Sequence, residues 1–319
     1  MSVDTRPLAI LLMGPTASGK TGLAVELAKH FPVDIISVDS ALVYRGMDIG
    51  TAKPDEETLR IAPHRLIDIR DPVQPYSAAE FVSDALREMQ AITANGRIPL
   101  LVGGTMLYFR ALEKGLSALP AADAVLRKQL DERLQQQGLQ ALHDELTVVD
   151  PMAAQRIHPN DPQRILRALE VYHLTGKPLS EFFDQGVVAD NSHQYLKLIL
   201  SADDRALLHQ RINVRFDNML QAGFLNEVRQ LFQREDLYAE LPAMRAVGYR
   251  QAWQFLAGDL AEDEWVEKAK IATRQYAKRQ LTWLRSEQDA HWLNPGDTEE
   301  TKKKLKLICT ERAVQKRLC

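Results

Sequence analysis

A glycine-rich segment near the amino end carries the clearest chemistry in the sequence. Residues 14–21 read GPTASGKT and match the phosphate-binding pattern G-x-x-x-x-G-K-[ST] in full. Glycine lets the backbone wrap an anion closely, and successive N–H groups at a helix N-terminus offer it fixed positive potential. Lys20 adds a point charge, and the Thr21 hydroxyl is suited to hold Mg²⁺, largely through water and the phosphates. We therefore expect a phosphate-chain site made by Gly14, Pro15, Thr16, Ala17, Ser18, Gly19, Lys20 and Thr21; the alternative is a glycine-rich turn without a ligand.

Two polar residues follow other apolar runs and are candidates for catalysis. Asp39 comes directly after the run Ile35–Val38, and Thr105 follows the run Ile98–Val102 and two glycines. In open α/β sheets, ligands bind beyond the carboxyl ends of the strands, so both side chains should share the crevice of the phosphate site. An ionised Asp39 would accept a proton from an amine or a hydroxyl, and Thr105 would donate to a phosphate oxygen. The alternative role for each residue is that of a helix N-cap.

The phosphate motif alone does not say which phosphate compound binds. An enzyme that hydrolyses nucleotides should also carry an apolar strand that ends in an acid near the metal. Here the run Leu100–Val102 is followed by Gly-Gly-Thr, and Asp68 lies inside the run His64–Ile69 rather than at its end. This pattern leaves room for a phosphate chain that acts as a leaving group.

Composition excludes several classes of protein. The 319 residues are 45% hydrophobic and 26% charged, which is ordinary for a globular chain. With 40 basic and 43 acidic side chains the net charge is −3, so nucleic-acid binding must rest on local patches. The two cysteines, Cys309 and Cys319, exclude a disulfide scaffold, and the eight histidines show no metal-ligand spacing. No apolar run is long enough to cross a bilayer and no secretory segment is recognisable, so we expect a cytoplasmic protein with no membrane partner.

The alternation of apolar runs with helical patterns predicts an α/β fold. Buried strands are expected over Leu8–Met13, Ile35–Val38, Arg65–Ile69, Ile98–Val102, Tyr195–Ser201 and His291–Leu293. Helices are expected over residues 22–30, 78–93, 203–222, 223–234, 249–256 and 262–285. Near-continuous apolar strands separated by helices are typical of a parallel sheet covered on both faces, here a P-loop NTPase-like core.

A segment without strands interrupts this pattern. Helices are expected over residues 127–137 and 161–174, and no convincing strand lies near them. We therefore expect a discontinuous α/β core over 1–118 and 197–298, with an all-helical insertion over 119–196.

Two basic regions lie toward the carboxyl end. On an ideal helix Lys270, Arg274, Lys278 and Arg285 fall within about 80° of one another, and no acid occurs between the first and the last of them. Because that stretch offers no acidic i,i+4 partner, we favour a surface that faces phosphates over one that is only solvated. The tail over 299–319 is basic as well, and we expect a poorly ordered terminus there rather than an RNA-binding arm.

Taken together, these segments resemble the tRNA dimethylallyltransferases, also called tRNA isopentenylpyrophosphate transferases. The likeness is carried, in family order, by GPTASGKT at 14–21, SVDSALVYRGMDIGTAKP at 37–54, PHRLIDI at 63–69, GGTMLY at 103–108, HPNDPQRILRALE at 158–170, VGYRQ at 247–251 and TRQYAKRQLTWLR at 273–285. The block at 37–54 is the most specific of them, and the lysine-rich tail is not covered by the family pattern.

The resemblance implies transfer of a dimethylallyl group from dimethylallyl pyrophosphate, with Mg²⁺, to a tRNA. The acceptor would be N6 of the adenosine 3′ of the anticodon in tRNAs that read codons beginning with U. Pyrophosphate would leave from the P-loop while Asp39 takes the proton from the amine and Thr105 assists. The insertion would grip the anticodon arm, and a monomer without an obligate protein partner is expected. By resemblance the tRNA contacts are Asp39, Ser40, Ala41, Leu42, Thr105, Arg127, Gln163, Arg164, Ile165, Leu166, Arg167, Arg245, Ala246, Val247, Gly248, Tyr249, Arg250, Lys278, Arg279, Gln280, Leu281, Thr282, Trp283, Leu284 and Arg285.

Three other interpretations stay open. A P-loop kinase would use ATP as donor and Asp39 as the base for a hydroxyl. A transferase acting on free adenine nucleotides would need neither the helical insertion nor the basic helix face. A phosphate-sensing RNA-binding protein would use the same surfaces without turnover.

Overall fold

The computed structural model describes residues 5–184, 192–202, 204–295, 299 and 303. The chain forms two compact units, one made of Met1–Glu113 with Asn191–Cys319 and the other of Lys114–Asp190. The corresponding boundaries expected from the sequence are 118/119 and 196/197. The basic tail predicted over 299–319 lies outside the described residues except at positions 299 and 303.

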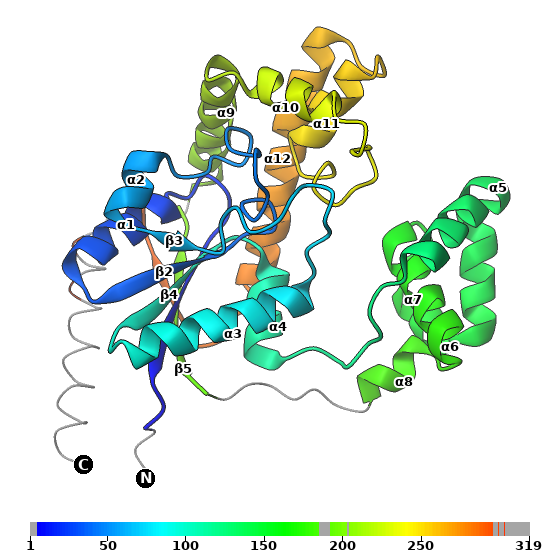
Figure 1. Cartoon of the computed structure of the whole chain (residues 1–319), viewed down its shortest axis with the longest axis horizontal. Coiled ribbons are helices and arrows are strands. Elements are labelled where there is room, and N and C mark those ends of the chain that lie inside the picture. Colours follow the sequence, from blue (N-terminus) through cyan, green and yellow to red (C-terminus); the bar gives the residue numbers. More distant parts are fainter. Residues whose placement is uncertain (1–4, 185–191, 203, 296–298, 300–302, 304–319) are drawn as a thin grey trace. The chain divides into compact units, whose positions relative to one another are not determined.

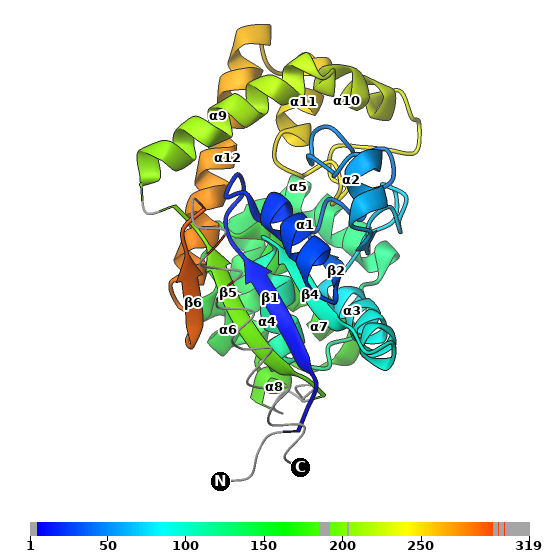
Figure 2. The same cartoon turned by 90° about the vertical axis from the view of Figure 1, so that its left-hand side faces the viewer.

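The first unit is built on one six-stranded sheet (Figure 1). Its strands are β1 (Leu8–Met13), β2 (Val33–Val38), β3 (His64–Arg65), β4 (Ile98–Gly103), β5 (Gln194–Leu200) and β6 (Ala290–Leu293). They are arranged in the order β3-β2-β4-β1-β5-β6, and every neighbouring pair is parallel. Figure 2 shows β5 beside β1 and β6 on the far side of β5. The predicted parallel α/β core is confirmed.

The register brings three loops to one edge of the sheet. Met13, the last residue of β1, lies opposite Gly103 of β4, and Gly103 lies opposite Val38 of β2. A side chain at Gly103 would not fit there, because its Cβ would stand 1.9 Å from the carbonyl oxygen of Val38. The segments that follow these three strands, including the P-loop, therefore leave the sheet side by side.

Alternating residues of β1 feed two separate cores. Ala9, Leu11 and Met13 face a large apolar cluster, whereas Ile10 and Leu12 face a smaller one. Three helices of the amino-terminal half cover these faces, namely α1 (Lys20–His30), α3 (Ala78–Ala94) and α4 (Met106–Lys114), while the short helix α2 (Glu56–Ile61) has no buried residue. Buried residues of α1 belong to the smaller cluster and those of α3 and α4 to the larger one. Because strands buried on both faces must be apolar at every position, β1 reads as an unbroken apolar run.

The third predicted strand is wrong in length. An extended segment was expected over Arg65–Ile69, but only His64 and Arg65 pair with β2. The backbone of Leu66 and Asp68 has positive φ, at 62° and 57°, which ends the ladder. Asp68 is held there by Lys53, whose ammonium lies 2.5 Å from its carboxylate.

Four helices of the carboxyl-terminal half complete the first unit. They are α9 (Arg205–Gln221), α10 (Phe224–Phe232), α11 (Tyr249–Leu256) and α12 (Glu262–Leu284). Edge-to-face ring contacts join them: Phe224 meets Phe216 at 6.0 Å and Tyr249 at 5.1 Å between ring centroids. These rings belong to the larger apolar cluster of the sheet, so the four helices share one core with the strands.

The second unit is helical, as expected. It contains α5 (Ala124–Val149), α6 (Pro151–Arg156), α7 (Pro162–Thr175) and α8 (Leu179–Asp184), with an apolar core of its own. The helix expected over 127–137 ends at Gly138, as predicted: the backbone there, with φ 81° and ψ 163°, is not helical, and a second helical stretch follows it to Val149 within α5. Over the part of the chain that the structure describes, no helix combines the length and apolar content that a bilayer crossing requires.

Candidate functional site

The P-loop joins the end of β1 to the start of α1. Its last glycine, Gly19, has a φ of 91°, which glycine adopts without strain and which lets the chain turn sharply into the helix. Gly14 is needed for space, since a Cβ there would lie 2.4 Å from the carbonyl oxygen of Leu200. The first N–H groups of a helix have no partner within it, so the start of α1 presents hydrogen-bond donors and positive potential to a ligand. This geometry is that of an anion cradle.

Lys20 provides the first cation of the cradle. Its Nζ donates to the carbonyl oxygen of Pro15 at 2.7 Å and to the hydroxyl of Ser18 at 3.4 Å. Burial lowers the pKa of Lys20 to about 7, and the positive charge of Arg215 acts in the same direction, while the negative charge of Asp39 opposes both. The ammonium is therefore poorly compensated, and an arriving anion would restore its charge.

Arg215 provides the second cation, and the sequence analysis missed it. It lies on α9 and lines a cavity of about 580 Å³ that is bounded by the P-loop residues from Ala17 to Thr21, by Ala52 and by one face of α9. Its Nη2 donates to the carbonyl oxygen of Thr51 at 3.1 Å, and burial lowers the pKa of its guanidinium. Within the described residues it has no acidic ion-pair partner. A half-buried arginine without an acidic ion-pair partner beside a phosphate loop is suited to bind a second phosphate group.

The one sequence signal for this cation was the spacing of α9. Arg211 and Arg215 are four residues apart, so they lie on one helix face, and both line this P-loop cavity. Nothing in the local sequence shows that this face meets the P-loop, which lies almost 200 residues earlier.

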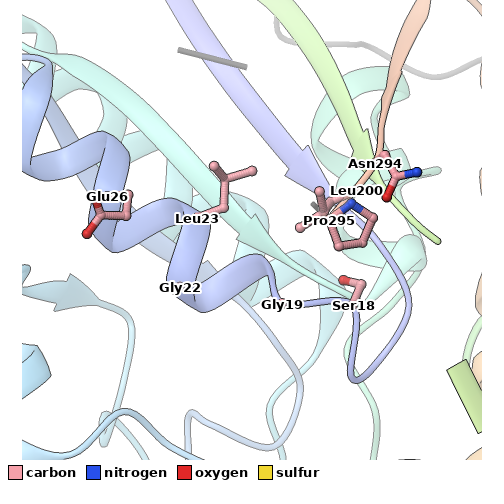
Figure 3. Close-up of a pocket in the computed structure, with 8 residues that line it drawn as sticks. All are labelled: Ser18, Gly19, Gly22, Leu23, Glu26, Leu200, Asn294 and Pro295. Atoms are coloured by element: carbon pink, nitrogen blue, oxygen red, sulfur yellow. The ribbon is translucent and has the colours of Figure 1, made fainter. Parts of the chain in front are cut away.

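A smaller hollow of about 230 Å³ lies against the same loop (Figure 3). It is lined by Ser18, Gly19, Gly22, Leu23, Glu26, Leu200, Asn294 and Pro295. Glu26, on the next turn of α1 after Gly22, adds a negative charge, and no lysine or arginine lines the hollow. The P-loop cavity, with Lys20 and Arg215, is therefore the better place for a phosphate chain.

Asp39 lies at the carboxyl end of β2 and acts on the same cations. Its charge raises the pKa of both Lys20 and Arg215 against the effect of burial. Its Oδ1 accepts the backbone N–H groups of Ala41 at 2.8 Å and Leu42 at 3.3 Å. The turn-capping alternative is thus present, but it engages one oxygen only. No hydrogen bond among the described residues engages Oδ2, which stays available for a substrate.

Thr105 connects the loop after β4 to the loop that carries Asp39. Its Oγ1 accepts the backbone N–H of Ser40 at 3.1 Å, and its own N–H donates to the carbonyl oxygen of Val38 at 3.3 Å. Tyr276 of α12 lies near this pair, since the negative charge of Asp39, together with burial, raises the pKa of its phenol. Asp39, Thr105 and the P-loop cations thus lie within electrostatic reach of one another.

Glu227 on α10 explains much of the specific block at 37–54. Its two carboxylate oxygens accept the N–H groups of Asp48 at 2.8 Å, Ile49 at 2.7 Å and Gly50 at 3.1 Å, and the hydroxyl of Tyr249 at 2.5 Å. Gly50 leaves room for that ring, because a Cβ there would lie 2.6 Å from it. One carboxylate therefore holds the loop that leads to Thr51, the residue whose carbonyl meets Arg215.

Lys53 holds the other end of the same block. Its Nζ donates to the carbonyl oxygen of Tyr44 at 3.1 Å and forms ion pairs with Asp48 and Asp68. The ammonium is nearly buried, so these partners fix the loop after Asp39 rather than face a ligand.

The basic face predicted on α12 is smaller than expected. Lys270 pairs with Asp217 of α9 at 2.6 Å, and Arg274 contacts Asn213 at 3.0 Å and Glu267 at 2.9 Å. Because Lys270 and Arg274 are paired with neighbouring side chains, the prediction that they belong to a phosphate-facing surface is wrong. Lys278 and Arg285 are exposed, and neither has an acidic partner in the described part of the chain.

Three residues named as RNA contacts by resemblance have buried side chains. Ile165, Tyr249 and Leu284 have 0% of their surface exposed, which corrects the prediction for these side chains. Gln280 is 4% exposed and bonds to two loops of the sheet edge, as described below. The exposed members of the predicted set are Ser40, Arg127, Gln163, Arg164, Arg245, Arg250, Lys278, Arg279, Thr282 and Arg285, and the structure does not test their contacts with RNA.

In the helical unit, one buried carboxylate holds two arginines. Glu170 accepts from Arg127 Nε at 3.1 Å and from Arg167 Nη1 at 2.6 Å, while its side chain is 1% exposed. Arg167 also donates to the carbonyl oxygen of Pro120 at 2.6 Å. Two cations on one carboxylate leave an excess positive charge, and the Arg127 side chain is half-exposed.

Comparison with known proteins gives a consistent result. Residues 42–287 match the family model described as IPP transferase. The chain is similar to the tRNA isopentenylpyrophosphate transferase of Bacillus halodurans, with 35% identity and a TM-score of 0.71 over 98% of this chain and 100% of that one. It is similar to the tRNA delta(2)-isopentenylpyrophosphate transferase of Staphylococcus epidermidis, with 36% identity and a TM-score of 0.68 over 96% and 100%. It is also similar to a eukaryotic dimethylallyltransferase acting on tRNA, with 28% identity and a TM-score of 0.76 over 94% and 78%.

We predict that Arg215→Met weakens the binding of inorganic pyrophosphate roughly tenfold to a hundredfold. The reason is that a charge-assisted hydrogen bond in a buried site contributes about 1.5–3 kcal/mol. Isothermal titration calorimetry measures the affinity, and Lys29→Met, on the exposed side of α1, is the matched control. Equal affinities of Arg215→Met and the wild-type protein would contradict a phosphate role for this arginine.

A second prediction concerns pH. Because the pKa of Lys20 is about 7, its ammonium is charged below that pH and loses its proton above it. Pyrophosphate affinity should therefore fall as the pH rises past about 7, and Lys20→Arg, which stays charged, should not show this fall. The measurement is the ratio of wild-type to variant affinity between about pH 6 and pH 9, in which the ionisation of pyrophosphate itself cancels. A constant ratio would show that Lys20 does not titrate in this range.

Proposed function

This chain belongs to the IPP transferase family, and we propose that it transfers a dimethylallyl group from dimethylallyl pyrophosphate to a tRNA adenosine. The family expected from the motifs is confirmed, and with it the transfer of a prenyl group to tRNA. The finer proposal is that the acceptor is N6 of the adenosine 3′ of the anticodon, in tRNAs that read codons beginning with U. The dimethylallyl donor is likewise a proposal.

One observation carries the donor assignment. The P-loop cavity places Lys20, Arg215 and the start of α1 around a single space, while Asp39 acts on the same two cations. Two cations suit a diphosphate, and a carboxylate within electrostatic reach of them suits a group that must lose a proton. The apolar strand β4 ends in Gly103 and is followed by Thr105 rather than by an acid, so nothing there favours hydrolysis of a nucleotide.

The acceptor needs activation, because the lone pair of an adenine amino group is delocalised into the ring. Asp39 Oδ1 is fixed by two backbone N–H groups, which orients Oδ2 for a hydrogen bond from N6–H. The new bond joins N6 to the allylic carbon, and the bond between that carbon and the diphosphate oxygen breaks. The proton of N6 goes to Asp39, and the bonding electrons leave with pyrophosphate.

The negative charge that develops on pyrophosphate is stabilised where it forms. Lys20 and Arg215 are partly buried and already held by hydrogen bonds, so they need little rearrangement during the reaction. The N–H groups at the start of α1 add donors that belong to the backbone. Holding both substrates in one space lowers the barrier further, because a bimolecular step becomes effectively intramolecular.

We propose Mg²⁺ as the cofactor. Thr21 lines the P-loop cavity, and its exposed hydroxyl is a suitable oxygen ligand. The described residues contain no cluster of three or more histidine, cysteine, aspartate or glutamate side chains that would form a metal cage. This donor set fits Mg²⁺, which keeps several waters and binds through few protein ligands and phosphates. When bound, the ion would neutralise charge on the diphosphate.

The acceptor base must reach the cavity from a structured loop of RNA. Bases that undergo chemistry are extruded from their stack, and single-stranded loops are held by contacts of arginine and lysine with phosphates. Lys278 and Arg285 of α12 are exposed cations for this purpose. Arg127 and Arg167 offer a second basic site in the helical unit.

A direct assay tests the proposal against a kinase. The protein is incubated with an anticodon stem-loop RNA and either radiolabelled dimethylallyl pyrophosphate or ATP labelled in its γ-phosphate. We expect label from the prenyl donor in the RNA and none from ATP, with mass spectrometry of the nucleosides locating the adduct on adenosine. Label from ATP alone would favour the kinase, and equally fast prenylation of AMP would remove the argument for RNA.

We predict that Asp39→Asn lowers kcat by a factor of about 10² or more. Asparagine keeps the oxygen that accepts the N–H groups of Ala41 and Leu42, so the turn is retained while the base is lost. Single-turnover prenylation measures the rate, and RNA binding should be largely unchanged. Full activity of Asp39→Asn would limit this residue to capping its turn.

We also predict that Lys278→Ala weakens RNA binding and reduces its salt dependence. Loss of one phosphate contact should lower the slope of log affinity against log salt by about 1, with pyrophosphate binding unchanged. Lys268→Ala is the control, since Lys268 lies on the same helix but pairs with Glu264. An unchanged slope for Lys278→Ala would mean that this cation is only solvated.

A further inference from the structure

We propose that Gln280 is a positioning residue for the diphosphate site, although it lies within the stretch of α12 that faces RNA by resemblance. The inference rests on the proposed function and assigns this side chain to the donor rather than to the tRNA. The carboxamide of Gln280 is 4% exposed and lies between two loops at the edge of the sheet. It therefore has no surface to offer to a polymer.

Two hydrogen bonds of Gln280 to the backbone use opposite ends of its amide, and its side chain also interacts with the phenol of Tyr276. Its Oε1 accepts the backbone N–H of Thr16 in the P-loop at 2.9 Å, and its Nε2 donates to the carbonyl oxygen of Gly104 at 2.8 Å. Only a group with an acceptor and a donor at fixed spacing can serve both partners, and a side-chain amide is such a group. Thr16 and Gly104 are 88 residues apart in sequence, and Gln280 of α12 connects the loops that carry them.

The contact of Gln280 with the loop after β4 leaves no space for a side chain at Gly104. A Cβ at Gly104 would lie 2.4 Å from Nε2 of Gln280, and its φ is not in the positive range that only glycine favours. The glycine is therefore required for the space that Gln280 occupies rather than for a special backbone conformation. The residue that follows it is Thr105, the proposed catalytic hydroxyl.

This bond orients the P-loop for its ligand. The bond from Thr16 N–H to Gln280 fixes the first part of the loop, and the residues from Ala17 to Thr21 that follow it line the P-loop cavity. Lys20 then lies across the same loop, on the carbonyl oxygen of Pro15. Gln280 acts on the diphosphate through these groups and touches neither substrate.

The same helix serves the RNA on its other side. At 100° per residue, Lys278 lies about 200° around α12 from Gln280, and it is exposed. Substitutions at these two positions should therefore separate the functions of the helix. A change at Gln280 should act on the donor, and a change at Lys278 should act on the RNA.

The first test compares Gln280→Leu with the wild-type protein and with Gln275→Leu, an exposed glutamine on the same helix. We expect Gln280→Leu to raise the Kd for inorganic pyrophosphate and the KM for the prenyl donor roughly tenfold or more, because one buried and one partly buried hydrogen bond are lost. The KM for RNA should stay within about twofold, and Gln275→Leu should resemble the wild type. Unchanged pyrophosphate binding, or an equal loss for both substrates, would overturn the proposal.

Gln280→Glu gives a second test that does not depend on the tolerance of the fold for leucine. A neutral carboxylic acid accepts and donates as the amide does, whereas a carboxylate cannot donate to Gly104. Pyrophosphate binding by Gln280→Glu, taken as a ratio to the wild type, should therefore recover as the pH falls. A ratio that does not change with pH would contradict the paired hydrogen bonds.

A double substitution gives the third test. Gly104→Ala alone should weaken pyrophosphate binding, because its methyl group displaces the amide of Gln280. In the background of Gln280→Ala, where the space is open, the same change should cost less than twofold. Additive effects would show that the two positions act independently and would contradict the proposed contact.

Pyrophosphate binding does not require prenyl transfer. If the transfer assay failed while pyrophosphate binding still depended on Gln280, the proposed activity would be rejected and the positioning role of Gln280 would be retained.

Discussion

An excess of partly buried positive charge beside the end of β1 is the constraint on which the other features of the site depend. Lys20 and Arg215 lie around one cavity, and burial lowers the pKa of both. Bringing two cations together away from water is unfavourable unless an anion compensates them. Asp39 supplies part of that charge, and a diphosphate would supply the rest. Other interactions keep the cations in place: the carbonyl oxygen of Thr51 accepts a hydrogen bond from the Arg215 guanidinium, and Glu227 holds the loop that carries Thr51.

The edge of the sheet is assembled from parts that are distant in the chain. The register of β1, β4 and β2 brings three loops together, and helices of the carboxyl-terminal half then fix them. Gln280 joins two of those loops, and Glu227 holds the continuation of the third. The site is therefore complete only when the first unit has folded, because Gln280 and Glu227 hold loops that belong to the first 110 residues of the chain.

Much of this arrangement was predictable because local patterns determine it. The strand Leu8–Met13 and the glycine motif after it follow from apolar patterning and backbone freedom. The remainder depends on contacts that no local pattern contains. Positive φ at Leu66 and Asp68 shortens a strand that reads as apolar, and the acid that neutralises Lys270 lies on another helix, at Asp217. Arg215 could be recognised only as one of two arginines on a helix face, and the role of Gln280 follows from a fold in which α12 meets the P-loop.

The shared carboxylate of the helical unit has a consequence for how this enzyme can diverge. Arg127, Arg167 and Glu170 form one charge set, with a single buried acid between two guanidinium groups. Replacing either arginine alone would leave the acid neutralised and remove the surplus charge, whereas replacing the acid would leave two cations to repel each other. Glu170 should therefore be kept among descendants of this chain as long as both arginines are present, whereas either arginine can be lost while the acid stays paired with the other.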